Sequence, residues 1–436
     1  MPLYLSLRIV ILKLIDLNWF IDYNTKSMGI INRSEYLNSL IKSKDTQIVK
    51  IVSGIRRCGK STLMEIYCNW LLANGVDAQR IISINFEEIH FEHLNNYRLL
   101  YEYITPLLHQ DGMNYIFLDE IQHVSQFEKA VYSLFIKKNV DLYITGSNAY
   151  FMSGELSTLL TGRYIEIKML PLSFSEYCEG LNLFVPEKKL SKMEKYVSYL
   201  DSSFPYVLQL KQDQKDIRSY LEGLYNSIIL KDIVARYKIS DVMMLESVVR
   251  FLFHNIGNLL STSKIANTMT SEGRKIDQKT VEKYIKGLTD SLMMYQVNRY
   301  NIKGKQLLAT LEKYYLSDIG LRQFLLGKGS ADFGYILENI VYLELLRRGN
   351  NVYVGHLPGG EVDFIAQNAD GITYYQAAAT VLDSNTLRRE FSSLEKIKDH
   401  YPKILLTLDE IGTGTKENGI IQLNVLDWLL GANADY

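Results

Sequence analysis

The chain has 436 residues, of which 47% are hydrophobic and 22% charged, and its formal net charge is −1. This length exceeds an ordinary domain of about 100–200 residues, so two or three domains are expected. The near-neutral charge excludes a polycation, and any binding of nucleic acid must come from a local basic patch.

The N-terminal stretch 2–21 is rich in apolar side chains but is interrupted by Arg8, Lys13 and Asp16. A membrane-spanning helix needs about 20 residues with few or no charges, and a signal peptide needs a small-residue cleavage site, which is not evident here. We therefore expect no membrane partner. We interpret residues 1–27 as a non-native upstream extension, with translation starting at Met28.

The three cysteines, Cys58, Cys68 and Cys178, form neither an even disulfide framework nor a metal-ligand spacing. Their ordinary role is that of small, buried, apolar residues. This usage indicates a reducing compartment, so the protein is expected to be cytoplasmic.

Between residues 28 and 170, short apolar runs alternate with helical stretches. Strands that are apolar nearly throughout are typical of a parallel sheet covered by helices on both faces. The region is therefore predicted to be an α/β domain. Its expected strands lie at 48–52, 81–86, 115–118, 142–145 and 165–169.

Three further parts are expected after residue 170. Residues 171–243 have helical periodicity and are predicted to form a helical lid. Residues 244–310 read as three helices and then a hairpin of strands at 293–300 and 306–308, the pattern of a winged helix-turn-helix. Residues 311–436 are predicted to form a second α/β domain, with helices at 335–348 and 386–399 and strands at 352–354, 362–366, 372–376 and 404–408.

A glycine-rich loop, GIRRCGKS, follows the first predicted strand and opens a helical stretch. This is the G-x-x-x-x-G-K-[ST] pattern, in which backbone N–H groups at a helix N-terminus surround phosphates. Lys60 is predicted to reach the β- and γ-phosphates, and Ser61 to bind Mg²⁺. The predicted nucleotide-binding residues are Gly54, Ile55, Arg56, Arg57, Cys58, Gly59, Lys60, Ser61 and Thr62.

A second motif is YIFLDE, an apolar strand that ends in Asp119 and Glu120. Alone, this run is more typical of a capped strand end. Its position downstream of the phosphate loop favours a catalytic pair instead. Asp119 is then expected to hold Mg²⁺ through water, and Glu120 to orient or deprotonate the attacking water.

Two weaker candidates follow in the chain. Ser147 or Asn148, at the end of the strand at 142–145, is predicted to touch the γ-phosphate or the water, although a plain polar strand end explains both residues equally well. Arg163 is predicted to be an arginine finger, which neutralises charge on the γ-phosphate; the alternative is an ordinary surface arginine.

Basic residues also mark the predicted winged helix. Lys279, Lys283 and Lys286 share one face of its third helix, opposite the apolar face. The hairpin adds Arg299, Lys303 and Lys305. Such a helix is suited to the major groove of DNA, with the hairpin on phosphates, whereas the alternative is a solvated face on a packing module.

These motifs, together with ITGSNA, LTGRY and LPLSFSEY, resemble a family of prokaryotic AAA-type ATPases over about residues 28–430. In that family a winged helix and a C-terminal domain of uncharacterised function follow the ATPase domain. The resemblance implies ATP and Mg²⁺ as ligands and a relation to replication-initiator and signalling NTPases. Relatives often carry glycines before Pro205, near the adenine, where this chain has Ser202, Ser203 and Phe204.

The order of elements in residues 311–436 is similar to the restriction-endonuclease superfamily. That resemblance places site residues at Glu338, Asp363 and Gln376, with Glu361 nearby, and puts Ala378 where the superfamily has a lysine. Without that charge the domain is predicted not to cut DNA. In the minority alternative, Lys396 or Lys398 takes over the role.

Two functions are consistent with the sequence. The first is Mg²⁺-dependent ATP hydrolysis that drives a switch or motor acting on DNA or on an unknown protein partner, with the chain in a homo-oligomer. The second is a nucleotide-gated module that binds DNA or protein with little turnover.

Overall fold

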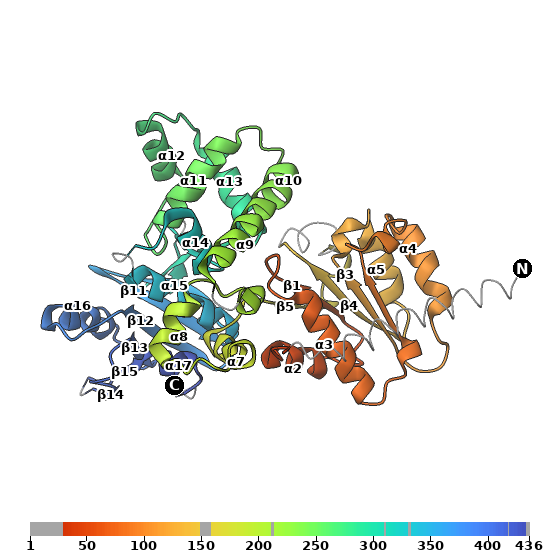
Figure 1. Cartoon of the computed structure of the whole chain (residues 1–436). Coiled ribbons are helices and arrows are strands. Elements are labelled where there is room, and N and C mark those ends of the chain that lie inside the picture. Colours follow the sequence, from red (N-terminus) through yellow and green to blue (C-terminus); the bar gives the residue numbers. More distant parts are fainter. Residues whose placement is uncertain are drawn as a thin grey trace, which may run out of the picture.

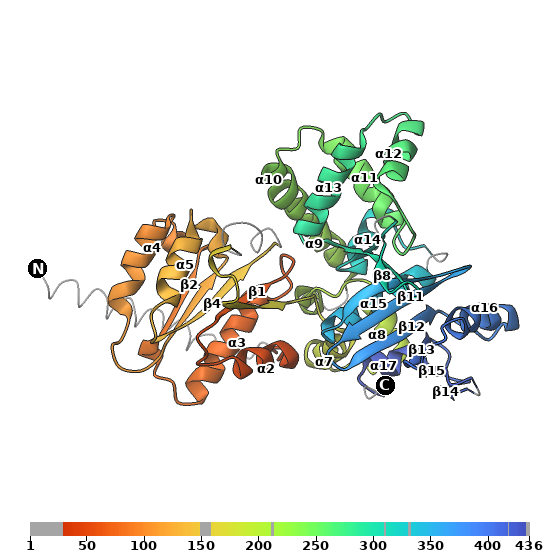
Figure 2. The same cartoon turned by 180° about the vertical axis from the view of Figure 1, so that it is seen from behind.

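The structure is a computed structural model that describes residues 29–148, 158–210, 213–308, 311–329, 333–416 and 418–432. The expected extension at 1–27 lies outside these residues. Figures 1 and 2 show two lobes: the first contains β1–β5 with α2–α5, and the second contains the later helices and the C-terminal sheet. Within the described residues, no helix has both the length and the apolar character that crossing a bilayer requires.

The first lobe is built on a five-stranded sheet in the order β2-β3-β4-β1-β5, in which every neighbouring pair is parallel. All five predicted strands are confirmed. Strand β4 lies between β1, which leads into the glycine-rich loop, and β3, which ends at the acidic pair. The strands are β1 (Val49–Ser53), β2 (Ile81–Asn85), β3 (Asn114–Asp119), β4 (Val140–Gly146) and β5 (Tyr164–Lys168).

Both faces of this sheet are covered, which explains its nearly continuous apolar strands. Tyr115 and Phe117 of β3 join the core that includes α2 (Ser34–Lys42) and α3 (Lys60–Ala73). Ile116 and Leu118 point the other way, into the core that includes the helices α4 (Tyr97–Ile104) and α5 (Phe127–Phe135). Alternation along a strand sends neighbouring side chains to opposite faces, so an apolar run fills both cores.

A helical segment follows β5. Its first two helices, α7 (Phe174–Phe184) and α8 (Lys192–Tyr199), each begin with a capping box, at Ser173 and Ser191. A short 3₁₀ segment, η6 (Pro205–Leu210), precedes one long helical rod. The rod consists of α9 (Gln214–Ser227), the π-helix η7 (Ile228–Val234) and α10 (Ala235–Tyr237).

Three helices come next: α11 (Val242–His254), α12 (Thr262–Ser271) and α13 (Gln278–Asp290). The predicted hairpin is partly wrong. Strand β7 (Arg299–Asn301) does pair with β8 (Gln306–Leu307), but β6 (Met294–Val297) pairs instead with β9 (Lys313–Leu316), beyond the expected boundary at residue 310. The reason is burial: all four residues of β9 are buried and match the buried ends of β6, whereas β8 is exposed.

The C-terminal sheet is mixed and has eight strands in the order β14-β15-β13-β12-β11-β10-β7-β8. Strand β7 therefore continues it, parallel to β10. The predicted elements of this region are present, while β9, α14, β14, β15 and α17 were not predicted. Its other elements are α14 (Ile319–Leu326), α15 (Phe333–Arg347), β10 (Asn351–Leu357), β11 (Gly360–Asn368), β12 (Gly371–Ala378), α16 (Ser384–Glu395), β13 (Lys403–Thr407), β14 (Gly414–Thr415), β15 (Ile421–Asn424) and α17 (Val425–Leu429).

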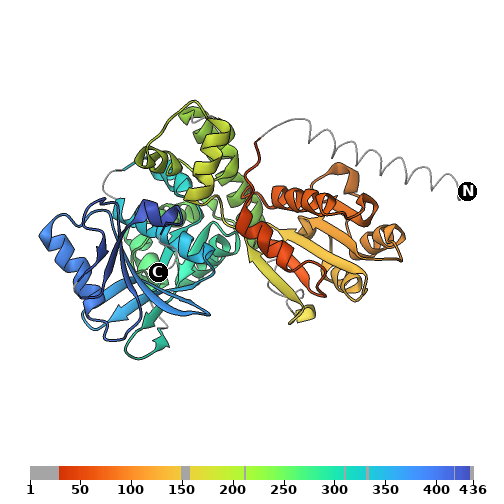
Figure 3. The same cartoon turned by 90° about the horizontal axis from the view of Figure 1, so that it is seen from below.

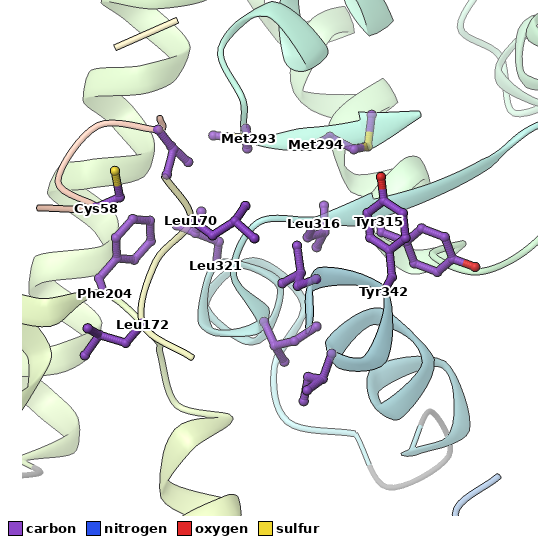
Figure 4. Close-up of a cluster of buried hydrophobic side chains, with 14 of the residues drawn as sticks. Cys58, Leu170, Leu172, Phe204, Met293, Met294, Tyr315, Leu316, Leu321 and Tyr342 are labelled. Carbon is purple, nitrogen blue, oxygen red and sulfur yellow. The ribbon is translucent and has the colours of Figure 1, made fainter. Parts of the chain in front are cut away.

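One hydrophobic core connects the two lobes. It runs from Cys58 in the glycine-rich loop through Leu170 and Phe204 to Met293 and Tyr342, and Figure 4 shows these side chains close together. Figure 3 shows from below how α2 and α3 approach the second lobe. The glycine-rich loop therefore sits at the junction between the lobes.

Candidate nucleotide-binding site

The glycine-rich loop connects β1 to α3, and two of its glycines are required by geometry. A Cβ on Gly54 would lie 2.4 Å from the Met169 carbonyl oxygen and 2.7 Å from the Cys58 sulfur, closer than atoms can approach. Gly59 has φ +104° and is the N-cap of α3, a conformation that side chains strongly disfavour. The result is a tight loop ending at the N-terminus of a 14-residue helix, which is suited to hold anions.

Lys60, the first residue of α3, is buried beneath this loop. Its ammonium donates to the Gly54 carbonyl at 3.1 Å and to the Ser147 hydroxyl at 2.9 Å, and lies 3.3 Å from a carboxylate oxygen of Glu120. Burial opposes its charge, but the acidic groups of Cys58, Glu120 and Asp119 together raise the pKa of Lys60. Lys60 is therefore positively charged at neutral pH.

Asp119 ends β3 and accepts a hydrogen bond from the Thr145 hydroxyl, which itself accepts one from the Glu120 backbone N–H at 2.8 Å. Burial raises the pKa of Asp119, and a hydrogen bond from Ser61 acts in the opposite direction. The structure thus brings together Ser61 and Asp119, the two predicted magnesium ligands, from α3 and β3.

Glu120 follows directly, in a left-handed backbone conformation with φ 53°. Its carboxylate accepts hydrogen bonds from Ser147 and Gln122. Burial alone would raise the pKa of Glu120. The charge of Lys60 and these hydrogen bonds outweigh burial and hold that pKa below its usual value. The residue is a buried anion positioned by three side chains.

Of the two candidates at the end of β4, Ser147 is the residue that touches the site, because it bridges Lys60 and Glu120. Asn148 is buried beside it. The role expected for Asn148 remains a prediction. Two other predicted nucleotide-binding residues differ in exposure: Thr62 is exposed, and Ile55 is buried.

Arg163 lies at the opposite end of the sheet from the glycine-rich loop. Its carbonyl accepts the backbone N–H of Val49, at the start of β1, and its guanidinium donates to the Tyr132 hydroxyl at 3.1 Å. The loop begins after the last residue of β1, roughly 15 Å away at about 3.3 Å per residue. Arg163 therefore does not reach the site of its own chain.

Two contacts of the loop were not anticipated. The buried Arg33 donates to the Cys58 carbonyl at 2.9 Å and to the Leu170 carbonyl at 2.6 Å. Arg56 extends out of the loop and forms two hydrogen bonds with Asp232 of η7, at 2.8 and 3.0 Å. No local motif marks Arg33, and the motif that contains Arg56 does not indicate its contact with Asp232, because the partners of both residues are far away in the sequence.

Pro205 does approach the loop, since its ring lies 3.7 Å from the position of a Cβ on Gly59. The two serines before Pro205 form their hydrogen bonds with Asp318 rather than with the loop. The backbone N–H and hydroxyl of Ser203 donate to Asp318 at 2.6 and 2.7 Å, and the Ser202 hydroxyl donates to the same carboxylate at 3.2 Å.

A second charged cluster lies in the C-terminal part. The buried ammonium of Lys313, on β9, lies 2.8 Å from Glu338, 2.7 Å from Glu361 and 3.9 Å from Asp363. Gln376 accepts a hydrogen bond from the Asp363 backbone at 3.2 Å. Burial, and then the charge of Glu338, raises the pKa of Asp363 well above its ordinary value.

No sequence motif indicates that Lys313 belongs to this cluster. Of the two lysines considered as substitutes for Ala378, Lys396 donates to the Gly359 carbonyl at 2.8 Å and Lys398 to the Glu395 carbonyl at 3.4 Å. The lysine that reaches the cluster thus comes from a strand that the sequence did not reveal.

The predicted DNA-binding lysines are exposed. Lys279, Lys283 and Lys286 lie on one side of α13, and Lys286 is 3.2 Å from Asp290. Lys303 and Lys305 are exposed in the turn between β7 and β8. Arg299 is engaged with the His356 ring nitrogen at 2.8 Å.

The sequence matches two family models: an AAA domain over residues 46–178 and a domain of unknown function (DUF8612) over residues 193–332. An uncharacterised protein of Haemophilus influenzae is 39% identical over 93% of this chain and 100% of its own length. The uncharacterised protein MJ1544 of Methanocaldococcus jannaschii is 30% identical over 86% of this chain and 83% of its own.

Solved structures give weaker similarities. The Walker-type ATPase PABY2304 of Pyrococcus abyssi is 18% identical, with a TM-score of 0.46, over 68% of this chain and 96% of that one. The ORC1 protein of Aeropyrum pernix, solved in complex with DNA, is 11% identical, with a TM-score of 0.29, over 67% of this chain and 91% of that one.

The two relatives and the family models, which match at the level of sequence, decide the family. The chain belongs to the protein family that the two uncharacterised relatives represent, and its residues 46–178 are an AAA domain of the P-loop ATPase type.

Proposed function

We propose that the protein hydrolyses ATP with Mg²⁺ and uses the cycle to switch or drive its second lobe against DNA or a protein partner. The observation that supports this most is the convergence of Lys60, Ser61, Asp119, Glu120 and Ser147 beside one helix N-terminus.

The side chains at this site suit Mg²⁺ and the phosphates of ATP. Hydroxyl and carboxylate oxygens, as on Ser61 and Asp119, are the groups that Mg²⁺ prefers. When bound, Mg²⁺ neutralises charge that builds on the phosphates. The loop N–H groups and Lys60 hold the phosphates, and Glu120 accepts the proton of the attacking water or orients it. Ser147 keeps the Glu120 carboxylate in place.

Two substitutions test this assignment. Lys60→Ala removes the charge beneath the loop and is expected to abolish nucleotide binding. Glu120→Gln keeps the shape but removes the acceptor, so it should bind ATP normally and lose at least about 10²-fold in turnover. Binding of a fluorescent ATP analogue and phosphate release measure the two effects. The exposed Glu102→Gln is the control. Normal turnover by Glu120→Gln would refute the catalytic role.

The alternative function is a nucleotide-gated module with little turnover. A comparison of the wild type with Glu120→Gln distinguishes it from an ATP-hydrolysing switch or motor. In that case the wild type and Glu120→Gln release phosphate equally slowly, while both still bind a partner in a nucleotide-dependent way.

We also propose that Arg163 completes the site of a second copy of the chain, because it does not reach its own. Neither Arg163→Ala nor Lys60→Ala should turn over ATP alone. A mixture of the two should recover activity, because one subunit brings the nucleotide and the other brings the arginine. The exposed Lys138→Ala is the control. A mixture that stays inactive, together with wild-type specific activity independent of protein concentration, would show that the arginine does not act between copies.

We propose that Lys279, Lys283, Lys286 and Lys303 contact DNA phosphates, because these lysines are exposed, three on one side of α13 and one in the turn between β7 and β8. Affinity for duplex DNA should then fall steeply with salt. Changing Lys283 to Gln should reduce the slope of log K against log [salt] by about 1. Lys42→Gln, an exposed lysine on α2, is the matched control. No binding at low salt would point to a protein partner instead.

The C-terminal part is predicted not to cut DNA, and Lys313 supplies a reason beyond the loss of the usual lysine. Its ammonium contacts both Glu338 and Glu361 and offsets part of their negative charge, which weakens the attraction of these carboxylates for a metal ion. Supercoiled plasmid incubated with the protein, Mg²⁺ or Mn²⁺, and ATP should stay intact. Nicking that disappears in Asp363→Ala would show an active nuclease.

A further inference from the structure

Arg56 is a phosphate-loop residue whose side chain is held by the second lobe. Its guanidinium forms two hydrogen bonds with Asp232, at 2.8 and 3.0 Å, and lies 3.4 Å from Glu87. Asp232 is 6% exposed, whereas Glu87 is 49% exposed, so the contact with Asp232 is the strong one. A paired arginine–carboxylate geometry also adds directional strength.

The same guanidinium lies close to the reacting end of the nucleotide site. Arg56 is in the loop between Gly54 and Lys60. Hydrogen bonding to Asp232 raises the pKa of Arg56, and the nearby carboxylate of Glu120 adds to this. Arg56 belongs to the same short loop as Lys60, whose ammonium lies 3.3 Å from Glu120, so Arg56 borders the place where the terminal phosphate of ATP is expected.

Asp232 belongs to η7, a π-helical segment that is packed against α13. A Cβ on Gly287 of α13 would lie 2.8 Å from a methyl group of Ile233, so the two helices touch without space between them. Further along the rod, the Tyr237 hydroxyl donates to Asp290 of α13. Single π-helical turns within α-helices are frequently found at functional sites.

We propose that Asp232 and the γ-phosphate of ATP compete for Arg56, so that ATP, but not ADP, releases η7 and changes its packing against α13. This inference rests on the proposed ATPase site. Because coupling is reciprocal, the contact that ATP weakens must in turn weaken ATP binding. Removing the charge of Asp232 should therefore increase the affinity for ATP without changing the affinity for ADP.

The test compares ATP and ADP affinities by titration of the full chain. In Asp232→Asn, which keeps the side-chain shape, we expect ATP to bind roughly fivefold tighter or more, the usual size of such coupling, with ADP affinity unchanged. In Arg56→Gln the preference for ATP over ADP should decrease. Glu87→Gln, which removes the exposed partner of Arg56, is the matched control and should leave both affinities unchanged.

Hydrogen exchange on the wild-type protein provides a second readout that needs no variant to fold. ATP should speed exchange in residues 228–237 relative to ADP, and this difference should be absent in Arg56→Gln. Equal exchange with both nucleotides, or equal changes of ATP and ADP affinity in Asp232→Asn, would show that the pair is only structural. A wild-type protein that binds no nucleotide would refute the proposed function instead.

Discussion

The guanidinium of Arg33 holds the phosphate loop in position against the rest of the chain. It is 4% exposed and donates to the carbonyls of Cys58 and Leu170 while pairing with Glu176 at 2.8 Å. Removing one partner of a buried ion pair typically costs about 3–5 kcal/mol. Glu176 also closes the capping box of α7, so this interaction links the loop, the segment after β5 and the first helix of the second lobe.

Strand β4 then sets the distances within the site. Because it lies between β1 and β3, its Thr145 contacts both residues of the acidic pair, and Ser147, directly after the strand, contacts both Lys60 and Glu120. Buried charges are costly unless they are paired. Lys60 and Glu120 satisfy this requirement together, and the Ser147 hydroxyl hydrogen-bonds to both of them.

The parts that could be predicted from sequence are those encoded locally. The phosphate loop, the acidic pair and all five strands of the first sheet are contiguous motifs or apolar runs. The missed features depend on distant partners: Arg33 with Glu176, Arg56 with Asp232, and Lys313 with Glu338. A single charged residue in a sequence looks like a surface residue, and only the tertiary structure shows that it is buried. Strand β9 was missed for the same reason, since it begins with the buried lysine.

The pairing of β7 with β10 has a consequence for how the chain folds. The two strands join residues 299–301 to residues 354–356, so one edge of the C-terminal sheet is covered by a hairpin made earlier in the chain. Uncovered strand edges are prone to pair with other molecules. During synthesis the β7–β8 hairpin leaves the ribosome before β10 does, and domains generally assemble in that order. The nascent chain therefore already contains β7 and β8 when β10 is made, and residues 354–356 of β10 can pair within the same chain rather than with another molecule.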